Sequence, residues 1–164
     1  MIFGMTIAQF TALHVVISII GIGSGLVAVQ ALGDGRWLAR WQAVFLATTV
    51  LTSVTGFLFP ITAFTPALGT GILSMIVLIV ALVAAYGFGL RGRARTVYAV
   101  AAAAALWLNL FVLVVQSFLK VPGLNGLAPT GTEPPFLIAQ ALVLIGAIAL
   151  GWRAVRGGGS VRPA

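Results

Sequence analysis

The charged residues of this chain are few and grouped, and they divide it into long apolar runs. Between Ala8 and Gly151 only eight residues are charged, and all eight lie in three breaks. A bilayer core about 30 Å thick takes about 20 helical residues to cross. Four of the five runs have about that length, and the fifth reaches it when extended to Pro135–Val155. The runs are Ala8–Leu32, Trp41–Phe59, Ala67–Leu90, Val97–Leu119 and Phe136–Gly151. The sequence therefore predicts an all-α integral membrane bundle of five transmembrane helices.

The composition supports one membrane domain and little else. Of the 164 residues, 61% are hydrophobic and 7% are charged, so a soluble domain could not cover its apolar surface with polar side chains. We expect a single transmembrane domain over residues 1–156 and a disordered cytoplasmic tail over residues 157–164, which is rich in glycine. We also expect the first helix to stay uncleaved, because no Lys or Arg precedes it and its apolar stretch is longer than that of a signal peptide.

The basic residues fall on one side of such a bundle. With five spans, eight of the nine Lys and Arg residues lie in the first loop, the third loop and the C-terminal tail, and only Lys120 lies opposite. Cytoplasmic loops carry the excess of Lys and Arg. We therefore expect the N-terminus outside and the C-terminus inside. The net charge of +7 does not indicate nucleic acid, because the arginines sit at helix ends without a basic helix face. The expected partners are the lipid bilayer and, as open alternatives, another membrane protein or a second copy of the chain.

Several kinds of chemistry are absent from the sequence. The chain has no cysteine, which excludes disulfides, thiol catalysis and iron–sulfur clusters. Its one histidine, His14, has no second histidine to share a haem, and no Asp or Glu lies inside a predicted span. The sequence therefore indicates no catalytic residue, no metal site and no cofactor. Whether the protein is an enzyme stays open, with a non-enzymatic role favoured.

The first predicted helix carries a face of small and polar residues. His14, Ser18, Gly21 and Gly25 recur at helical spacing, and Gly21 and Gly25 form a GxxxG pattern that lets a neighbouring helix approach closely. The plain interpretation is a packing groove in which His14 forms one hydrogen bond to a neighbouring helix. The alternative is that His14 is a protonatable site or a metal ligand, since ionisable groups within membranes are often functional.

Other polar residues gather in the outer half of the predicted bundle. Asn and Gln amides in a membrane must face protein or water. Gln30 and Gln42 meet this requirement in the inner half, because they lie near enough to the inner surface to reach water. The polar set suggests an outward-facing pocket beneath the loop Lys120–Pro134, in which a small ligand could bind. Its candidate lining is His14, Thr55, Asn109, Gln116, Lys120, Glu133 and Gln140. The alternative is a set of separate interhelical hydrogen bonds without a cavity, with Lys120 and Glu133 merely solvated.

Two segments carry a resemblance. Residues 46–60, LATTVLTSVTGFLFP, and residues 108–122, LNLFVLVVQSFLKVP, with EPPF at residues 133–136, resemble small hypothetical multi-pass inner-membrane proteins of proteobacteria. The resemblance covers most of Leu13–Val155. It implies a bacterial inner membrane and carries over no functional residue, because no activity is known for that group.

Three functions are compatible with these features. The first is a non-enzymatic binding, channel-like or accessory subunit with an outward polar pocket. The second is a membrane redox component or other enzyme that uses His14. The third is a structural partner of a larger membrane complex, assembled through the small-residue faces.

Overall fold

Helices make up most of the chain. The computed structural model describes residues 1–60, 66–157 and 162–163. A π-helical turn, η1 (Val83–Gly87), continues the third helix, and two-residue strands β1 (Arg36–Trp37) and β2 (Arg162–Pro163) pair in parallel. The helices are α1 (Ile7–Gly33), α2 (Ala39–Phe57), α3 (Pro66–Leu82), α4 (Arg93–Lys120), the short α5 (Pro122–Leu127) and α6 (Pro134–Gly157). A long helix therefore overlaps each predicted apolar run, and the all-α class is confirmed.

Four of these helices are long and apolar enough to cross a membrane. They are Ile7–Gly33, Ala67–Gly87, Arg93–Lys120 and Pro134–Gly157. The helix α2 is not among them, because Arg40, Gln42 and a row of threonines make it more polar than the other four. The part of the chain that the structure describes is thus an all-helical protein with four candidate membrane-spanning helices.

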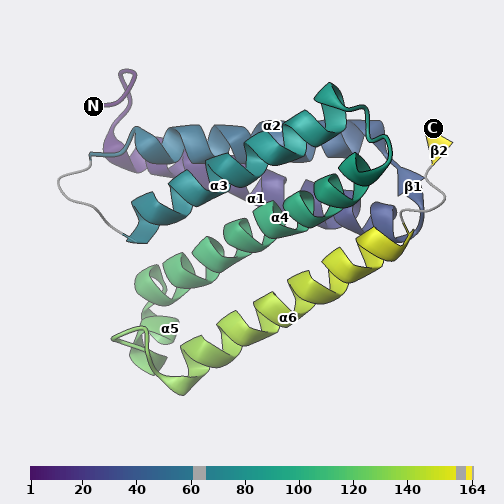
Figure 1. Cartoon of the computed structure of the whole chain (residues 1–164). Helices are drawn as coiled ribbons and strands as arrows, with labels where there is room; N and C mark the ends of the chain where they lie inside the picture. The colour runs from purple at the N-terminus through teal and green to yellow at the C-terminus, as the bar shows by residue number, and fades with distance from the viewer. Residues whose placement is uncertain (61–65, 158–161, 164) are drawn as a thin grey trace.

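The helices form an antiparallel bundle in which α4 holds a central place. The helix α1 packs against α2, α4 and α6, while α3 packs against α2 and α4. The N-terminus, the start of α3 and α5 lie at one end, which we call the α5 end (Figure 1). The opposite end holds β1, η1 and the last turn of α6. We call it the arginine end, because it carries Arg36, Arg40, Arg91, Arg93, Arg95, Arg153 and Arg156.

Local sequence sets the helix ends. The helix α1 starts with a capping box, in which the Thr6 hydroxyl accepts from the Gln9 amide nitrogen at 3.2 Å and the Gln9 side chain accepts from the Thr6 nitrogen at 2.9 Å. It ends at Gly33, and Gly35 then turns the chain at φ +72°, a conformation open to glycine. The last helix begins at Pro134, where a missing N–H leaves no helical hydrogen bond unmade.

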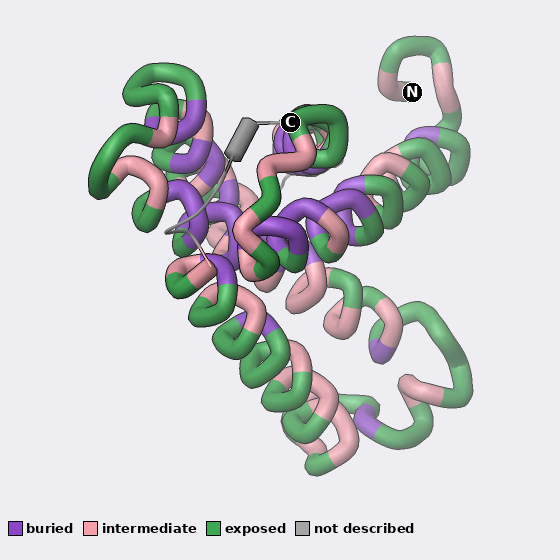
Figure 2. The backbone as a smooth tube through the Cα atoms, turned by 90° about the vertical axis from the view of Figure 1, so that its right-hand side faces the viewer, coloured by how far each residue is buried: buried purple, intermediate pink, exposed green. Residues whose placement is uncertain are grey.

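The hydrophobic core occupies the half of the bundle toward the arginine end. Its largest members include Val29 of α1, Phe45 of α2, Leu78 of α3 and Tyr98 and Leu106 of α4. Toward the α5 end, α4 and α6 diverge from α1, α2 and α3 (Figures 1 and 2). Buried positions become correspondingly rare in that half of the tube drawn in Figure 2. The bundle is therefore closed at one end and splayed at the other.

The C-terminal segment is described only in part. The predicted disordered tail, residues 157–164, falls mostly outside the described residues, because 158–161 and 164 are not among them. Gly157 is the last residue of α6, and a Cβ there would clash with the carbonyl oxygen of Gly33. Arg162–Pro163 pair with Arg36–Trp37. The described parts of this segment thus lie against the arginine end.

Polar side chains and candidate functional site

The polar residues of α1 and α2 face each other along one seam. The Nδ1 atom of His14 lies 2.8 Å from the Thr55 hydroxyl. One turn further, the Ser18 hydroxyl donates to the His14 carbonyl at 2.7 Å and lies 3.3 Å from the Thr52 hydroxyl. The Phe59 ring meets the His14 ring edge-on, with centroids 5.5 Å apart. Because the Thr55 hydroxyl donates to the Leu51 carbonyl at 2.7 Å, it is left to accept from an Nδ1–H of His14. The structure therefore gives His14 the interhelical bond of the plain interpretation.

The glycine face of α1 is where its neighbours come closest. Gly21 and Gly25 are both buried. A Cβ at Gly25 would lie 2.7 Å from the Phe45 ring of α2 and 3.0 Å from Leu106 of α4, and one at Gly21 would lie 3.2 Å from the Thr48 hydroxyl. Contacts under 3.0 Å do not occur with real Cβ atoms. The absence of a side chain is thus what allows three helices to meet here.

A buried hydrogen-bond network that the sequence analysis missed ties α1, α2 and α4 together. Gln42 is 0% exposed; its amide nitrogen donates to the Ala28 carbonyl at 3.0 Å, and its oxygen accepts from the Tyr98 hydroxyl at 2.5 Å. The Trp37 ring covers Tyr98 with centroids 5.4 Å apart. The expectation that Gln42 reaches water is therefore wrong. Its helical spacing could have indicated this burial. Phe45 follows Gln42 by three residues and Thr49 follows it by seven, so all three lie on the face that α2 buries.

Near mid-depth, short polar side chains join α2 to α3 and α4. Asn109 is buried and donates to the Thr49 hydroxyl at 3.3 Å, and Ser53 donates to the Ser74 hydroxyl at 3.2 Å. Ser53 lies close enough to the Thr49 carbonyl, at 3.1 Å, to share its proton with it. Hydroxyl groups in such helices satisfy themselves on the preceding turn and permit close packing. These contacts fill the bundle interior with satisfied polar groups, and they leave Asn109 in a helix interface.

Two glutamines in the splayed half have incomplete hydrogen bonding. Gln140 of α6 donates to the Phe111 carbonyl of α4 at 3.2 Å, but its amide oxygen is buried without a partner among the described residues. The Trp107 indole nitrogen is likewise buried and unpaired in the described chain. Gln116 is exposed on α4, and its amide bonds to no residue that the structure describes. An amide in this state is a group that water or a partner has to satisfy.

The loop at the α5 end is organised by Glu133. Its carboxylate accepts from the Thr130 nitrogen at 3.0 Å, the Thr130 hydroxyl at 2.9 Å and the Thr132 nitrogen at 3.0 Å. Desolvation acts to raise the pKa of Glu133, but these hydrogen bonds outweigh it, so the pKa lies below its ordinary value. Lys120 is exposed at the end of α4. Both residues thus belong to the loop surface.

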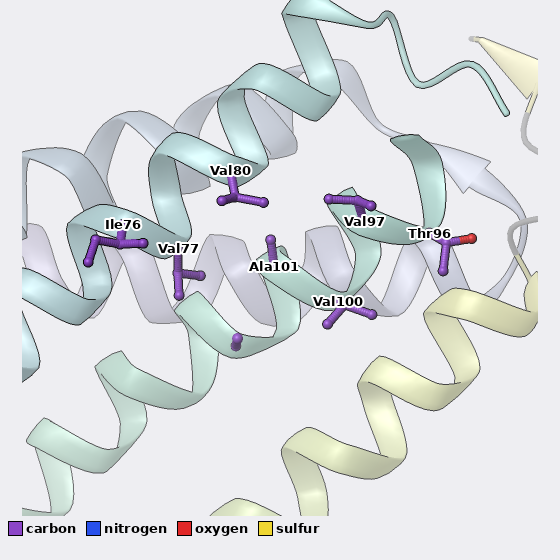
Figure 3. Close-up of a pocket in the computed structure, with 8 residues that line it drawn as sticks. Ile76, Val77, Val80, Thr96, Val97, Val100 and Ala101 are labelled. Atoms are coloured by element: carbon purple, nitrogen blue, oxygen red, sulfur yellow. The ribbon is translucent and has the colours of Figure 1, made fainter. Parts of the chain in front are cut away.

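No hydrogen bond joins His14, Gln116 and Gln140 to one another in the described part of the chain. His14 pairs with Thr55 on the seam between α1 and α2, Gln140 pairs with the backbone of α4, and Gln116 is exposed. His14 and Gln140 thus have separate interhelical hydrogen bonds, as the alternative interpretation expects for these two residues. One open groove of the described chain lies between α3 and α4, and its lining is apolar (Figure 3). A ligand-binding role for the seven candidates stays a prediction, without a shared cavity to support it.

Comparison with known proteins adds no relative. No family model matches the chain, and neither a curated protein nor a solved structure matches it. Among the described residues, no group of three or more His, Cys, Asp or Glu side chains could hold a metal ion. What the protein does has to be inferred from its own side chains.

Proposed function

We propose that the chain is a five-span protein of a bacterial inner membrane, with its N-terminus outside and its C-terminus inside. Two features support α2 as the fifth span. It has 19 residues, close to the length that a bilayer core requires, and it packs along α1 with its polar side chains turned to other helices. The gathering of seven arginines at the arginine end supports the orientation.

Reporter fusions test this topology. A reporter that is active only in the cytoplasm should be active when fused after Ala164, and also in the loop after Gly89, but inactive in the loop after Gly126. Activity at Gly126 with silence at Ala164 would invert the orientation. Activity at both Ala164 and Gly126 would show that α6 does not cross the membrane, and would contradict the five-span topology.

Within that membrane, we propose that the protein is a non-enzymatic accessory subunit that binds another membrane protein through its splayed half. The observation that carries this proposal is Gln116. Its amide lies four residues before the end of α4, about 6 Å below it at 1.5 Å per residue, exposed and without a hydrogen bond in the described chain. An amide at that depth, near the edge of the bilayer core, has to be satisfied by water or by a partner. Gln116 lies in the part of α4 toward the α5 end, where α4 and α6 diverge from the other helices (Figure 1).

The alternative hypotheses, a channel and a redox component, have less support. A channel needs polar groups free to line a path, whereas the buried Gln42, Thr49, Ser53 and Asn109 are engaged in hydrogen bonds between helices. A redox role for His14 needs a neighbouring reactive group, and the His14 ring contacts a threonine hydroxyl and a phenyl ring. An accessory role requires neither feature.

The chain has no cysteine, so a single cysteine can carry a photo-crosslinker to one chosen position. Gln116→Cys places it at the unpaired amide. Ile138→Cys is a matched control, because Ile138 is 58% exposed and lies four residues inside the start of α6, at a comparable depth. Both variants are labelled with a benzophenone maleimide in membranes of the native host and irradiated.

We expect one discrete heavier adduct from Gln116→Cys, with a second membrane protein in it, and none of that mass from Ile138→Cys. The same adduct at both positions would mean unspecific proximity and would overturn the proposal. An adduct of twice the chain mass would show that the partner is a second copy of this chain, and would contradict the proposal of a different membrane protein. Lipid adducts alone would show that the amide faces the bilayer and needs no partner.

A further inference from the structure

An apolar groove runs along the outside of the bundle between α3 and α4. Its volume is about 390 Å³, and it is lined by Ile76, Val77 and Val80 of α3 and by Thr96, Val97, Val100, Ala101 and Ala104 of α4. Figure 3 shows Val80 of α3 facing Val97 and Ala101 of α4. The alanines leave space that the valines on either side enclose. The groove therefore offers a channel of aliphatic surface that is open to the membrane.

The length of the groove matches one leaflet. From Thr96 to Ala104 the axis of α4 rises about 12 Å, against about 15 Å for half of a bilayer core. It begins next to the arginine end and stops near mid-depth, since α4 has 28 residues and Ala104 is the twelfth. One acyl chain of the leaflet at the arginine end would lie along it.

A basic group stands at the end of this groove. Arg93 lies on the same helical face as Val97, Val100 and Ala104, which follow it at spacings of four, seven and eleven residues. It is exposed, in the first turn of α4, a turn that contains no acidic residue and has no side-chain cap. Helix N-termini attract anions, and an arginine fork fits a phosphate. The aliphatic channel thus leads to a cationic site at its mouth.

Neither acidic side chain of the protein is placed to pair with Arg93. It has two acidic residues in all. Asp34 is paired with Arg153 at 3.1 Å, and Glu133 is held by threonines at the α5 end. Arg156 stacks on Trp152, with its guanidinium carbon 3.8 Å from the ring centroid. Arg93 therefore has no acidic side chain paired with it among the residues that the structure describes.

We propose that the α3–α4 groove binds one anionic phospholipid, with an acyl chain along Val80, Val97 and Ala104 and the phosphate at Arg93. The apolar channel alone would accept any lipid tail, and the arginine alone would attract any anion. Their continuity on one helix face favours the single molecule that combines both, a lipid with a charged head. The site depends on the membrane location of the helices and is independent of the accessory role proposed above.

Native mass spectrometry of the purified full chain in mild detergent measures the binding. Phosphatidylglycerol and phosphatidylcholine with identical acyl chains are added in turn, and the retained lipid is counted. We expect phosphatidylglycerol to be retained preferentially and Arg93→Gln to lower its retention about fivefold, the effect of one basic side chain near an anionic lipid. Arg40→Gln removes the same charge from the same end, outside the groove, and should leave retention unchanged.

A second arm tests the channel apart from the charge. Ala104→Phe fills the groove at a lipid-facing position and should lower the retention of both lipids, while Gly146→Phe on the open face of α6 should not. A photoactivatable phosphatidylglycerol should label α3 and α4 between Ile76 and Ala104. Equal losses from Arg93→Gln and Arg40→Gln would reduce the binding to general charge attraction and overturn the site. Labelling spread over all helices, or a second copy of the chain in the groove, would also overturn it.

Discussion

The closest approach between helices in the core makes Gly25 the most sensitive test of this packing. In Gly25→Ala the new methyl carbon would lie 2.7 Å from two atoms of the Phe45 ring and 3.0 Å from Leu106. Neither neighbour has a free direction to move, because Phe45 is 0% exposed and Leu106 is 1% exposed. The helices must therefore separate, or the ring must leave its preferred rotamer.

The size of the effect follows from two opposing contributions. Overpacking of a tight core costs about 1–3 kcal/mol. Replacing a helical glycine by alanine stabilises the helix by about 1 kcal/mol at most. Gly23→Ala isolates the second contribution, because nothing lies within 4 Å of a Cβ at Gly23 in the same helix. The free energy of unfolding of Gly25→Ala should thus lie about 1–3 kcal/mol below that of Gly23→Ala.

Thermal unfolding in a mild detergent, followed by size-exclusion chromatography of the heated sample, measures the difference. At about 2–4 °C per kcal/mol for a chain of this size, the Tm of Gly25→Ala should lie about 2–12 °C below that of Gly23→Ala. Adding Phe45→Leu should recover part of the loss, so that the two substitutions together cost less than their sum. Equal Tm values for the two alanine variants would refute the packing of α1 against α2 and α4.

Three further predictions concern single side chains. Tyr98→Phe should lower the free energy of unfolding by about 1–3 kcal/mol, because it leaves the buried Gln42 oxygen unpaired; chemical denaturation in detergent measures this. Asp34→Asn should change the Tm little, because the Asp34 and Arg153 side chains are 48% and 51% exposed and exposed ion pairs contribute about 1 kcal/mol or less; a shift like that of Tyr98→Phe would contradict this. Because the pKa of Glu133 is lowered, its carboxylate should hold the loop in place fully above the ordinary pKa, and this stabilisation should be lost as the pH falls through the lowered pKa. Hydrogen exchange of the loop amides, corrected for intrinsic rates, should show the loss. The variant Glu133→Gln should remove the pH dependence.

The helices could be predicted from the sequence because the signal for each is local. Long apolar runs interrupted by charge define α1, α3, α4 and α6, and glycine or proline marks their ends. The spacing of Gly21 and Gly25 likewise indicates a close-packed face, since only the absence of a side chain lets backbones approach so far. The span count is less local, because the polar residues that lower the hydropathy of α2 are buried by other helices.

The grouping of polar side chains could not be predicted, because depth in the membrane fixes only one of three coordinates. His14, Gln116 and Gln140 share a similar depth, but the rotation of each helix decides which neighbour a side chain meets. Rotation turns His14 toward α2 and leaves Gln116 exposed. Gln42 illustrates the converse, since its place near a helix end suggested contact with water while the packing of α1 and α4 encloses it.

The π-helical turn at the end of α3 makes this segment tolerant of a change in chain length. A π-turn accommodates one residue more than the α-helical turn it replaces. Losing one residue from Val83–Gly87 would restore α-helical pitch, and α3 before it would keep every contact. A deletion in the middle of α4 would instead rotate all later side chains by about 100° about the helix axis. Homologous chains that differ by one residue between α3 and α4 could therefore retain the same bundle.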